Sequence, residues 1–371
     1  MHIPLSRPDI SARDIEAVTA VLKTPFLSLG PKVGEFEQAM ARYAGVRHAV
    51  AVNSGTSALH LIVKSLGLGP GDEVITTPFS FVASANCVLF EGAKPVFVDI
   101  DPLTLNLDVS LIESRLSPRT KAILAVDVFG HPAEWDELQA LAKRHRLLLI
   151  EDSAEAIGAQ YKGRQAGSFG QAAVYAFYPN KQITTGEGGV VLTNDEQIAM
   201  LCRSICNQGR GQGGQWLQHE RLGYNFRLSD IHCALGISQL SRIEQILIQR
   251  QRVADGYRQR LQGVQEVELP YAAPHVKVSW FVYVIRLASH FTQADRDAVM
   301  ASLKAGGIQC SNYFAPIHLQ PFYRAMGYKA GDHPVAESTA QRTIALPFYN
   351  QITDEQLDRV AGALRQAIDA L

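Results

Sequence analysis

Between residues 39 and 152 the sequence alternates short apolar segments with longer amphipathic ones, and this alternation constrains the fold more than any other feature. The short segments are rich in Val, Ile and Leu, and the longer ones carry apolar residues at helical spacing. Strands are predicted at residues 48–52, 72–78, 95–100, 121–129 and 146–152, and helices at 57–68, 81–92 and 133–145. This order predicts an α/β fold whose mostly parallel central sheet has helices on both faces and binds ligands at the carboxyl ends of its strands.

Beyond residue 170 the alternation loosens. Residues 172–179 and 188–195 have the pattern of two strands around an unusual turn, and that turn contains Lys181. The Gly-rich stretch 209–216 has too little apolar content to pack, which predicts a surface loop. That loop could serve substrate entry or could simply connect two elements.

The C-terminal third of the chain has the pattern of a second, smaller domain. Residues 230–261 carry a continuous helical pattern that would lead into it, and a strand at 278–287 and a closing helix at 354–368 would belong to it. A chain of 371 residues is too long for one ordinary core. We therefore predict a large domain over residues 1–245 and a smaller α+β domain over 246–371.

The charge balance excludes some classes of partner. Lys and Arg total 35 against 36 Asp and Glu, so no net positive field exists to attract nucleic acid or an acidic membrane surface. No stretch approaches the roughly 18 uninterrupted apolar residues of a membrane span, and no signal-peptide pattern is present, so a cytoplasmic protein is expected. The five cysteines lack paired spacing, which indicates neither disulfides nor a metal site.

Two polar segments follow predicted strands and could bind a ligand. The loop 53–57 joins a strand to a helix, and its backbone N–H groups and hydroxyls could form a phosphate site or simply cap the helix. The strand at 146–152 ends in Glu151 and Asp152, which we expect to point towards the mouth of the sheet. One of these carboxylates could pair with a pyridinium nitrogen, or Asp152 could cap a following helix.

Lys181 lies in the turn between two apolar strands, which would hold its side chain in one direction. Partial burial would favour the neutral, nucleophilic amine, which can form a Schiff base. The glycines after it at 186, 188 and 189 allow unusual backbone angles in a crowded site. A surface lysine in a Gly-rich hairpin is the alternative.

A phosphate loop, a strand-end Asp and a turn Lys about 30 residues later occur in this order on one α/β sheet. With these features the sequence resembles the DegT/StrS family of sugar-nucleotide aminotransferases, which have the type I aspartate-aminotransferase fold and use pyridoxal phosphate. The resemblance covers nearly the whole chain, in the blocks GPKVGEFEQAMARYAGVRHAVAVNSGTSAL, GDEVITTPFSFVASANCV, EDSAEAIGA, FYPNKQITTGEGGVVLTND, LGYNFRLSDIHCALGISQL and PIHLQPFY.

The resemblance implies roles for four residues around the cofactor ring. Lys181 would hold the cofactor aldehyde and then move the proton between substrate and cofactor carbons. Asp152 would pair with the pyridine nitrogen, and Phe81 would stack on the ring unless it is a core aromatic. Glu155 falls where the family often carries Gln or His near the phenolic oxygen of the cofactor, and some members have Glu.

The resemblance also implies how the phosphate group is bound. Gly55, Thr56 and Ser57 would surround it, and Asn225 would reach the phosphate of the neighbouring subunit in a homodimer with shared active sites. One departure concerns position 176, where the family often has a Ser whose hydroxyl touches the phosphate and this chain has Ala176. Phosphate binding would then depend more on Thr56 and Asn225.

For the substrate, the resemblance points to Gly30 in an entry loop and to Asn312, Tyr313 and His318 on the sugar-nucleotide side of the site. A lone loop His is also commonly structural. The implied reaction transfers an amino group, with glutamate as the usual donor, to a nucleotide-linked keto-(deoxy)sugar, as in polysaccharide biosynthesis. Glu155 favours amination at the fourth carbon over the third.

Two alternatives remain. A few family members are dehydratases that remove a sugar hydroxyl, but they replace the lysine with His, which argues against that activity here. The other alternative is a regulatory member that has kept the fold and lost the chemistry. The presence of both Asp152 and Lys181 argues against it.

Overall fold

A computed structural model describes residues 2–211 and 218–371 of the chain. The loop predicted at 209–216 therefore lies mostly outside the described residues. The helices are α1 (Ala12–Leu22), α2 (Pro31–Ala44), α3 (Gly55–Ser65), α4 (Ala83–Phe90), α5 (Trp135–His145), α6 (Glu196–Cys206), α7 (Asp230–Leu240), α8 (Ile243–Leu261), α9 (Gln293–Ala305), α10 (Pro321–Ala325), α11 (Pro334–Arg342) and α12 (Asp354–Asp369), with short 3-10 turns η1 (Val109–Leu111), η2 (Glu113–Arg115), η3 (Val128–Gly130) and η4 (Ile317–Leu319).

The strands form three sheets. They are β1 (His48–Val52), β2 (Glu73–Thr76), β3 (Lys94–Phe97), β4 (Thr120–Val126), β5 (Leu148–Asp152), β6 (Gln160–Tyr161), β7 (Arg164–Gln165), β8 (Ala172–Ala176), β9 (Gly189–Thr193), β10 (Val267–Glu268), β11 (Val276–Lys277), β12 (Tyr283–Leu287) and β13 (Thr343–Leu346). A seven-stranded sheet has the order β1-β9-β8-β5-β4-β2-β3, and two three-stranded sheets have the orders β10-β12-β13 and β11-β6-β7.

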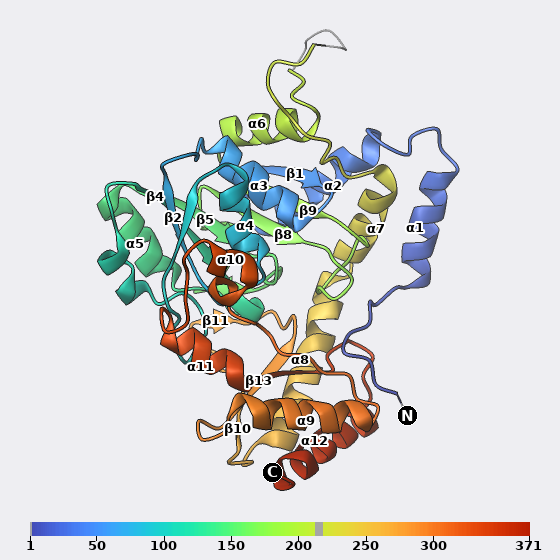
Figure 1. The fold of residues 1–371 in the computed structure, drawn as a ribbon. Coiled ribbons are helices and arrows are strands. Elements are labelled where there is room, and N and C mark those ends of the chain that lie inside the picture. Colours follow the sequence, from blue (N-terminus) through green and yellow to red (C-terminus); the bar gives the residue numbers. More distant parts are fainter. Residues whose placement is uncertain (1, 212–217) are drawn as a thin grey trace.

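The seven-stranded sheet confirms the predicted α/β fold. Its strands from β8 to β3 pair in parallel, and β9 runs antiparallel to both β1 and β8. One face packs against α3, α4 and α6, and the other against α2, α5, α7 and the start of α8 (Figure 1). Because β1, β8 and β5 run in the same direction, the residues that follow them lie at one edge of the sheet.

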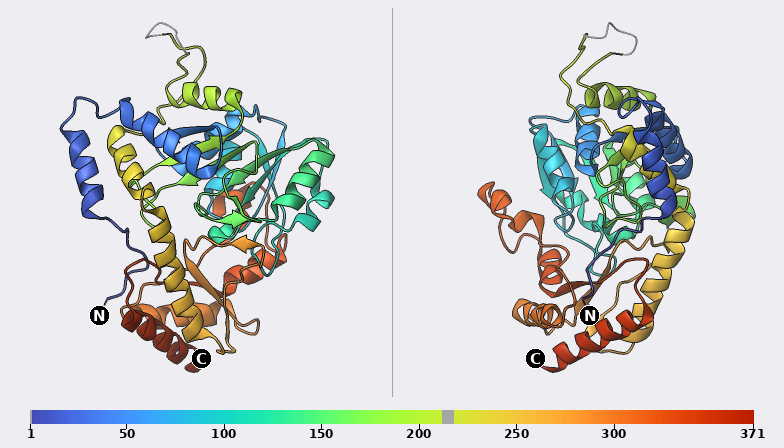
Figure 2. Two further views of the ribbon diagram at one scale, coloured as in Figure 1. Left: turned by 180° about the vertical axis from the view of Figure 1, so that it is seen from behind. Right: turned by 90° about the vertical axis from the view of Figure 1, so that its right-hand side faces the viewer.

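A second apolar cluster lies around the antiparallel sheet β10-β12-β13. It contains side chains of α9, α12 and the second half of α8, with Tyr257 and Tyr283 stacked at its centre, and Ile3 from the start of the chain joins it. Both termini lie at this end of the molecule (Figure 2). The predicted domain boundary at 245/246 falls within α8 and stays a prediction.

The single helix predicted over 230–261 is wrong, because α7 ends at Leu240 and α8 begins at Ile243. Arg242 leaves the helical conformation, with φ −122° and ψ 18°, and its guanidinium lies 3.1 Å from Asp14 Oδ2 and 3.2 Å from Asp9 Oδ2. These contacts come from the N-terminal segment, so no local pattern reveals the break. The strand predicted at 278–287 is also shorter, since β12 begins at Tyr283.

In the part of the chain that the structure describes, no helix is long and apolar enough to cross a membrane. The same residues contain no cluster of three or more His, Cys, Asp or Glu side chains that could hold a metal. The five cysteines are buried, free thiols.

Candidate active site

Lys181 lies in the turn after β8, and its amine is enclosed by an acid and an aromatic ring. Nζ lies 3.4 Å from Glu155 Oε1 and 3.9 Å from the centroid of the Phe281 ring. The backbone carbonyl of Lys181 accepts a hydrogen bond of 2.9 Å from Arg250 Nη2, which fixes the turn. The side chain is only 12% exposed, so this is not a surface lysine.

Asp152 is the last residue of β5 and is buried at the same edge of the sheet. Oδ2 accepts a hydrogen bond of 2.7 Å from Ser84 Oγ, and Oδ1 accepts one of 3.1 Å from the backbone N–H of Ala154. Residues 153–158 form turns, so Asp152 caps no helix. Burial raises the pKa of Asp152, and the hydrogen bonds and the positive charge of Lys181 oppose that shift.

Glu151 does not point towards the mouth of the sheet as predicted. Adjacent residues of a strand face opposite sides, so Glu151 lies on the other face of β5 from Asp152. There Glu151 accepts hydrogen bonds from the backbone N–H groups of Gly167, of Phe169 at 2.7 Å and of Gly170 at 3.4 Å. Its role is to hold the loop before β8.

The carboxyl group of Asp127, which the sequence analysis did not identify, lies beside that of Glu151. Ser153 Oγ is 2.6 Å from Asp127 Oδ2 and 2.8 Å from Glu151 Oε1. Burial, and then the neighbouring charge of Glu151, raise the pKa of Asp127 well above its usual value. Asp127 directly follows β4, much as Asp152 ends β5. This position at the end of a strand is the sequence feature that could have identified it.

Glu155 and Tyr313 complete the surroundings of the lysine. Glu155 Oε2 accepts a hydrogen bond of 3.0 Å from the backbone N–H of Phe129, and burial raises its pKa against the opposing charge of Lys181. The Tyr313 ring stacks with that of Phe281 at 6.4 Å between centroids. Burial, together with the charge of Glu155, raises the pKa of Tyr313. The structure therefore brings Tyr313 next to Phe281 and Glu155, the two groups that contact Lys181.

The loop after β1 forms the start of α3. Ser54 caps this helix by accepting a hydrogen bond of 3.0 Å from the backbone N–H of Ser57, whose hydroxyl donates to Asn53 Oδ1 at 2.7 Å. A Cβ added to Gly55 would lie 2.7 Å from the Cβ of Ala176. A glycine is therefore needed for the helix N-terminus to approach the end of β8.

Phe81 and Asn225 are exposed in the single chain. The Phe81 side chain is 61% exposed at the rim of a pocket. Asn225 lies beside the loop 53–57 of its own chain, where its carbonyl oxygen is 3.5 Å from Asn53 Nδ2.

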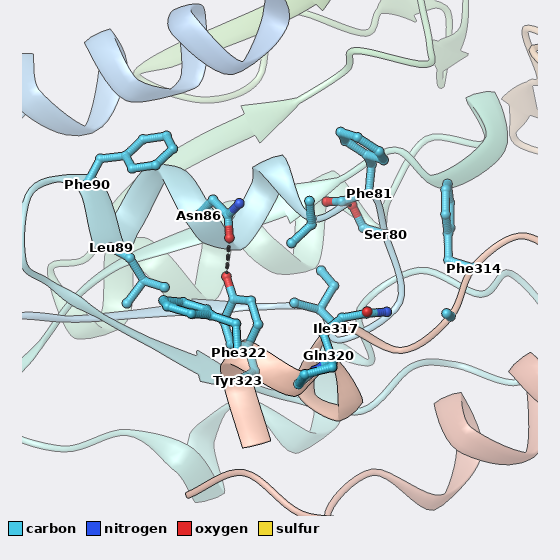
Figure 3. Close-up of a pocket in the computed structure, with 13 residues that line it drawn as sticks. Ser80, Phe81, Asn86, Leu89, Phe90, Phe314, Ile317, Gln320, Phe322 and Tyr323 are labelled. Carbon is cyan, nitrogen blue, oxygen red and sulfur yellow. Dashed lines mark hydrogen bonds between the residues drawn. The ribbon is translucent and has the colours of Figure 1, made fainter. Parts of the chain in front are cut away.

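That pocket has a volume of about 810 Å³ and lies between α4, α10 and the loop before α10 (Figure 3). Tyr323 donates a hydrogen bond of 2.7 Å from its hydroxyl to Asn86 Oδ1, which joins the two walls. The pocket is lined by Ser80, Phe81, Val82, Asn86, Leu89, Phe90, Phe314, Ala315, Ile317, Gln320, Pro321, Phe322 and Tyr323. Most of these were missed individually, although the blocks FSFVAS and PIHLQPFY that contain many of them carry the family resemblance.

Of the remaining predicted substrate residues, Gly30 and His318 have hydrogen-bond partners other than Lys181. The backbone N–H of Gly30 donates to Asp230 Oδ2 at 2.8 Å at the start of α2. His318 is fully buried, with Nε2 2.9 Å from Glu337 Oε1, and it lies behind the pocket wall. Asn312 is half-buried next to Tyr313. Their substrate roles stay predictions.

Residues 8–365 match the DegT/DnrJ/EryC1/StrS aminotransferase family. The chain belongs to this family. It is 38% identical over 369 residues to GDP-perosamine synthase of Caulobacter vibrioides, covering 99% of this chain and 98% of that protein. It is 37% identical over 377 residues to the spore coat polysaccharide biosynthesis protein SpsC of Bacillus subtilis, covering 99% and 97%. Among solved structures, Helicobacter pylori PseC, an aminotransferase of pseudoaminic acid biosynthesis, superposes with a TM-score of 0.96 at 30% identity and full coverage of both chains.

Members of the DegT/DnrJ/EryC1/StrS family are sugar aminotransferases that depend on pyridoxal phosphate, and solved neighbours include a pyridoxal-phosphate and a pyridoxamine-phosphate form. The fold is that of type I aminotransferases. The residues at the sheet edge fit this cofactor. They comprise the enclosed amine of Lys181, the buried carboxylate of Asp152 and a helix N-terminus that can bind phosphate next to Gly55.

Proposed function

We propose that this sugar aminotransferase transfers an amino group from glutamate to a nucleotide-linked keto-(deoxy)sugar, with the new amine at the fourth carbon. The observation that carries the proposal is the placement of the Lys181 amine, 3.4 Å from Glu155, at the sheet edge where Asp152 is buried. The similarity to GDP-perosamine synthase, whose name includes the nucleotide GDP, supports a nucleotide-linked substrate. The similarity to SpsC supports a place in polysaccharide biosynthesis.

Each residue of the site has a defined task in this proposal. The bound cofactor supplies an electron sink for charge that develops at the substrate carbon. Lys181 Nζ would remove and return the proton at that carbon, and the Asp152 carboxylate would hold the cofactor by accepting a hydrogen bond from its pyridine N–H. Glu155 would contact the phenolic oxygen of the bound cofactor. The same groups serve both half-reactions, so the kinetics should be ping-pong.

The phosphate and the ring face are bound by other residues. The N-terminus of α3 at Gly55, Thr56 and Ser57 would bind the phosphate, chiefly through the N–H groups of Gly55 and Thr56, because the N–H of Ser57 already donates to Ser54 Oγ. Phe81 would stack on the cofactor ring. The Ser57 hydroxyl already donates to Asn53, so in this proposal the backbone of the loop and the Thr56 hydroxyl contribute more than Ser57 Oγ.

We infer in addition that the active enzyme is a homodimer in which Asn225 of one subunit completes the phosphate site of the other. The Asn225 side chain is exposed in the single chain, which leaves it accessible to a second subunit and supports this inference. Mixing Lys181→Ala and Asn225→Ala subunits tests it. A mixed dimer has one site with both residues intact, so activity should rise above that of either variant alone. Unchanged activity after verified subunit exchange would contradict shared sites.

The reaction itself is tested by spectroscopy and product analysis. Protein with added pyridoxal phosphate should show a visible absorbance band that glutamate removes and a nucleotide-linked 4-keto-sugar restores, with the amino sugar detected by mass spectrometry. Lys181→Ala should lower turnover by at least about 10³-fold. Lys162→Ala is the matched control, because Lys162 pairs with Asp136 at the surface.

Each alternative has its own outcome in this experiment. Absence of the cofactor band would favour a binding role without chemistry. Loss of a sugar hydroxyl without gain of nitrogen would indicate a dehydratase. A band that glutamate leaves unchanged would overturn the choice of donor.

A further inference from the structure

We propose that Ser84 and Ser80 are positioning residues that form a chain of hydroxyl groups from the pocket wall to Asp152 and hold this carboxylate ionised and oriented. The inference rests on the proposed pairing of Asp152 with the cofactor nitrogen. The block FSFVAS was predicted to contribute only Phe81 to the site. The two serines on either side of that residue had no assigned role.

The geometry of the chain is continuous and buried. Ser84 Oγ lies 2.7 Å from Asp152 Oδ2, and Ser80 Oγ lies 2.7 Å from Ser84 Oγ. The three residues are 4%, 1% and 3% exposed for Ser80, Ser84 and Asp152. Ser80 also lines the pocket, where Figure 3 places it next to Phe81. The chain thus runs from the pocket wall to the carboxylate.

The direction of the hydrogen bonds follows from counting protons. A hydroxyl group has one proton to donate and lone pairs to accept. The proton of Ser84 is used on the carboxylate of Asp152, so Ser80 must be the donor to Ser84. The proton of Ser80 then points inward, and its oxygen remains an acceptor at the pocket wall. The carbonyl of Phe81, 3.2 Å from Ser80 Oγ, is the longer alternative acceptor.

The electrostatics explain why Asp152 needs this support. Burial raises its pKa, and the hydrogen bond from Ser84 is the largest effect that opposes the shift. Without Ser84, the buried carboxylate keeps the N–H of Ala154 and the more distant charge of Lys181. A protonated Asp152 cannot stabilise a positive charge on the pyridine nitrogen, so Ser84 acts on the cofactor through Asp152.

The backbone of α4 allows this contact. The helix begins at Ala83, so Ser84 lies in its first turn, and Ser80 precedes it by four residues. The N-cap residue is Val82, and the hydroxyls of Ser80 and Ser84 have oxygen atoms as partners, namely each other, the Phe81 carbonyl and Asp152 Oδ2, rather than N–H groups of the helix. Both hydroxyls are therefore committed to the chain that ends on Asp152.

The test compares Ser84→Ala, Ser84→Thr and Ser80→Ala in the complete enzyme. The first readouts are the Kd for pyridoxal phosphate and the pH titration of its absorbance. We expect Ser84→Ala to weaken cofactor binding and lower kcat by about tenfold, because a hydrogen bond to a charged group is lost. The KM for the sugar should not change. Ser84→Thr, which keeps the hydroxyl, should restore the wild-type pH titration, and Ser80→Ala should show a smaller effect in the same direction.

Two control variants distinguish a role in positioning Asp152 from a general loss of stability. Ser238 Oγ lies 2.6 Å from Asp14 Oδ1 in a comparable buried pair, so Ser238→Ala should lower the melting temperature without changing the cofactor titration. In an Asp152→Asn background, Ser84→Ala should add no further loss of kcat. A full additional loss would overturn the inference, as would equal behaviour of the Ala and Thr variants.

If Ser84→Ala does not fold, Ser84→Thr and Ser80→Ala still test the proposed role of the two serines. A Ser80→Ala enzyme identical to wild type in cofactor titration would show that the chain does not extend beyond Ser84. A changed titration in Ser84→Thr would then overturn the role of Ser84. Failure of the wild type itself to bind cofactor would instead refute the proposed function, so the two failures are distinguishable.

Discussion

Glu151 and Asp152 are consecutive acids at the end of one strand, both buried, but their surroundings differ completely. Glu151 accepts hydrogen bonds from the backbone of the loop 167–170 and shares Ser153 with Asp127. Asp152 receives one side-chain and one backbone donor and lies at the edge that holds Lys181. The alternation of side chains along a strand separates them. One acid supports the fold, and the other remains available to a ligand.

The same alternation extends to β8. In the parallel pairing of β5 and β8, Glu151 lies opposite Ala173, and Asp152 lies opposite Val174. Ala176, two residues after Val174, is therefore on the Asp152 face and touches the start of α3. The two faces of these strand ends have different tasks, so equivalent substitutions on them should have different consequences.

The largest change in activity relative to wild type is expected for Asp152→Asn. The amide oxygen can keep the hydrogen bond from the backbone N–H of Ala154, and the NH2 group can donate to Ser84 Oγ, but the side chain carries no charge to pair with a protonated pyridine nitrogen. We expect kcat to fall by about 10²–10³-fold. The unfolding midpoint without cofactor should stay the same or rise, since a buried charge is removed. Steady-state kinetics and thermal unfolding measure the two effects, and a kcat within threefold of wild type would contradict the assigned role.

Glu151→Gln should have the opposite effects, because it should lower stability and leave kcat nearly unchanged. Its amide NH2 group would face backbone N–H donors, so some of these would lose their acceptor in a buried place. We expect the free energy of unfolding to fall by about 1–3 kcal/mol in urea titrations. The kcat of the folded fraction should stay near that of wild type. Glu137→Gln on the exposed face of α5 is the matched control and should leave both quantities unchanged.

These contrasts define what the sequence could reveal. Apolar periodicity predicted the strands and helices of the central sheet, because burial dictates that pattern locally. The helix break at Arg242 was missed because its cause, Asp9 and Asp14, lies more than 220 residues away in the chain. Local propensity alone favours a continuous helix there.

The candidate site was predictable to a similar degree. Lys181 and Asp152 stand out because a turn lysine and a strand-end acid occur in a fixed order on one sheet. Their supporting residues do not stand out. Ser84 is 68 residues from Asp152, and Tyr323 is 237 residues from Asn86, so only the folded chain brings these pairs together. Glu151 was predicted at the mouth of the sheet because strand alternation was not applied to adjacent acids.

A smaller effect is expected for Asp127→Asn, and it depends on pH. The pKa of Asp127 is raised in the folded protein, so the folded state holds this proton at pH values where the unfolded chain has lost it. Its contribution to stability is complete below about pH 4 and is lost as the pH rises through the folded-state pKa. The Asn side chain can donate to Ser153 at all pH values, so the variant should not lose stability as the pH rises through this range.

The stability of Asp127→Asn relative to wild type should therefore increase with pH, by up to about 1.4 kcal/mol for each pH unit between the two pKa values. Urea unfolding of both proteins from pH 5 to 9 measures this difference. A difference that is constant or decreases with pH would mean that Asp127 is ionised throughout. In that case the hydroxyl of Ser153 could not satisfy both acids.

The smallest effect on function is expected for a substitution at Ala176, a position where the family that the sequence resembles often has a serine. On the Asp152 face, Ala176→Ser adds a hydroxyl next to the N-terminus of α3, so it should lower the Kd for pyridoxal phosphate about fivefold, as one added hydrogen bond would. The kcat should not change, since Ala176 touches no reacting atom in the proposed mechanism. Fluorescence titration of the cofactor-free protein measures the affinity.

The matched control is Ala173→Ser on the Glu151 face of the same strand. Ala173 is 1% exposed in an apolar cluster, so its added hydroxyl would be buried without a ligand to meet. We expect about 1–3 kcal/mol of lost stability and no gain in cofactor affinity. If Ala176→Ser binds the cofactor no better than wild type, the phosphate lies away from β8. Phosphate binding within the subunit would then depend on the loop 53–57 alone.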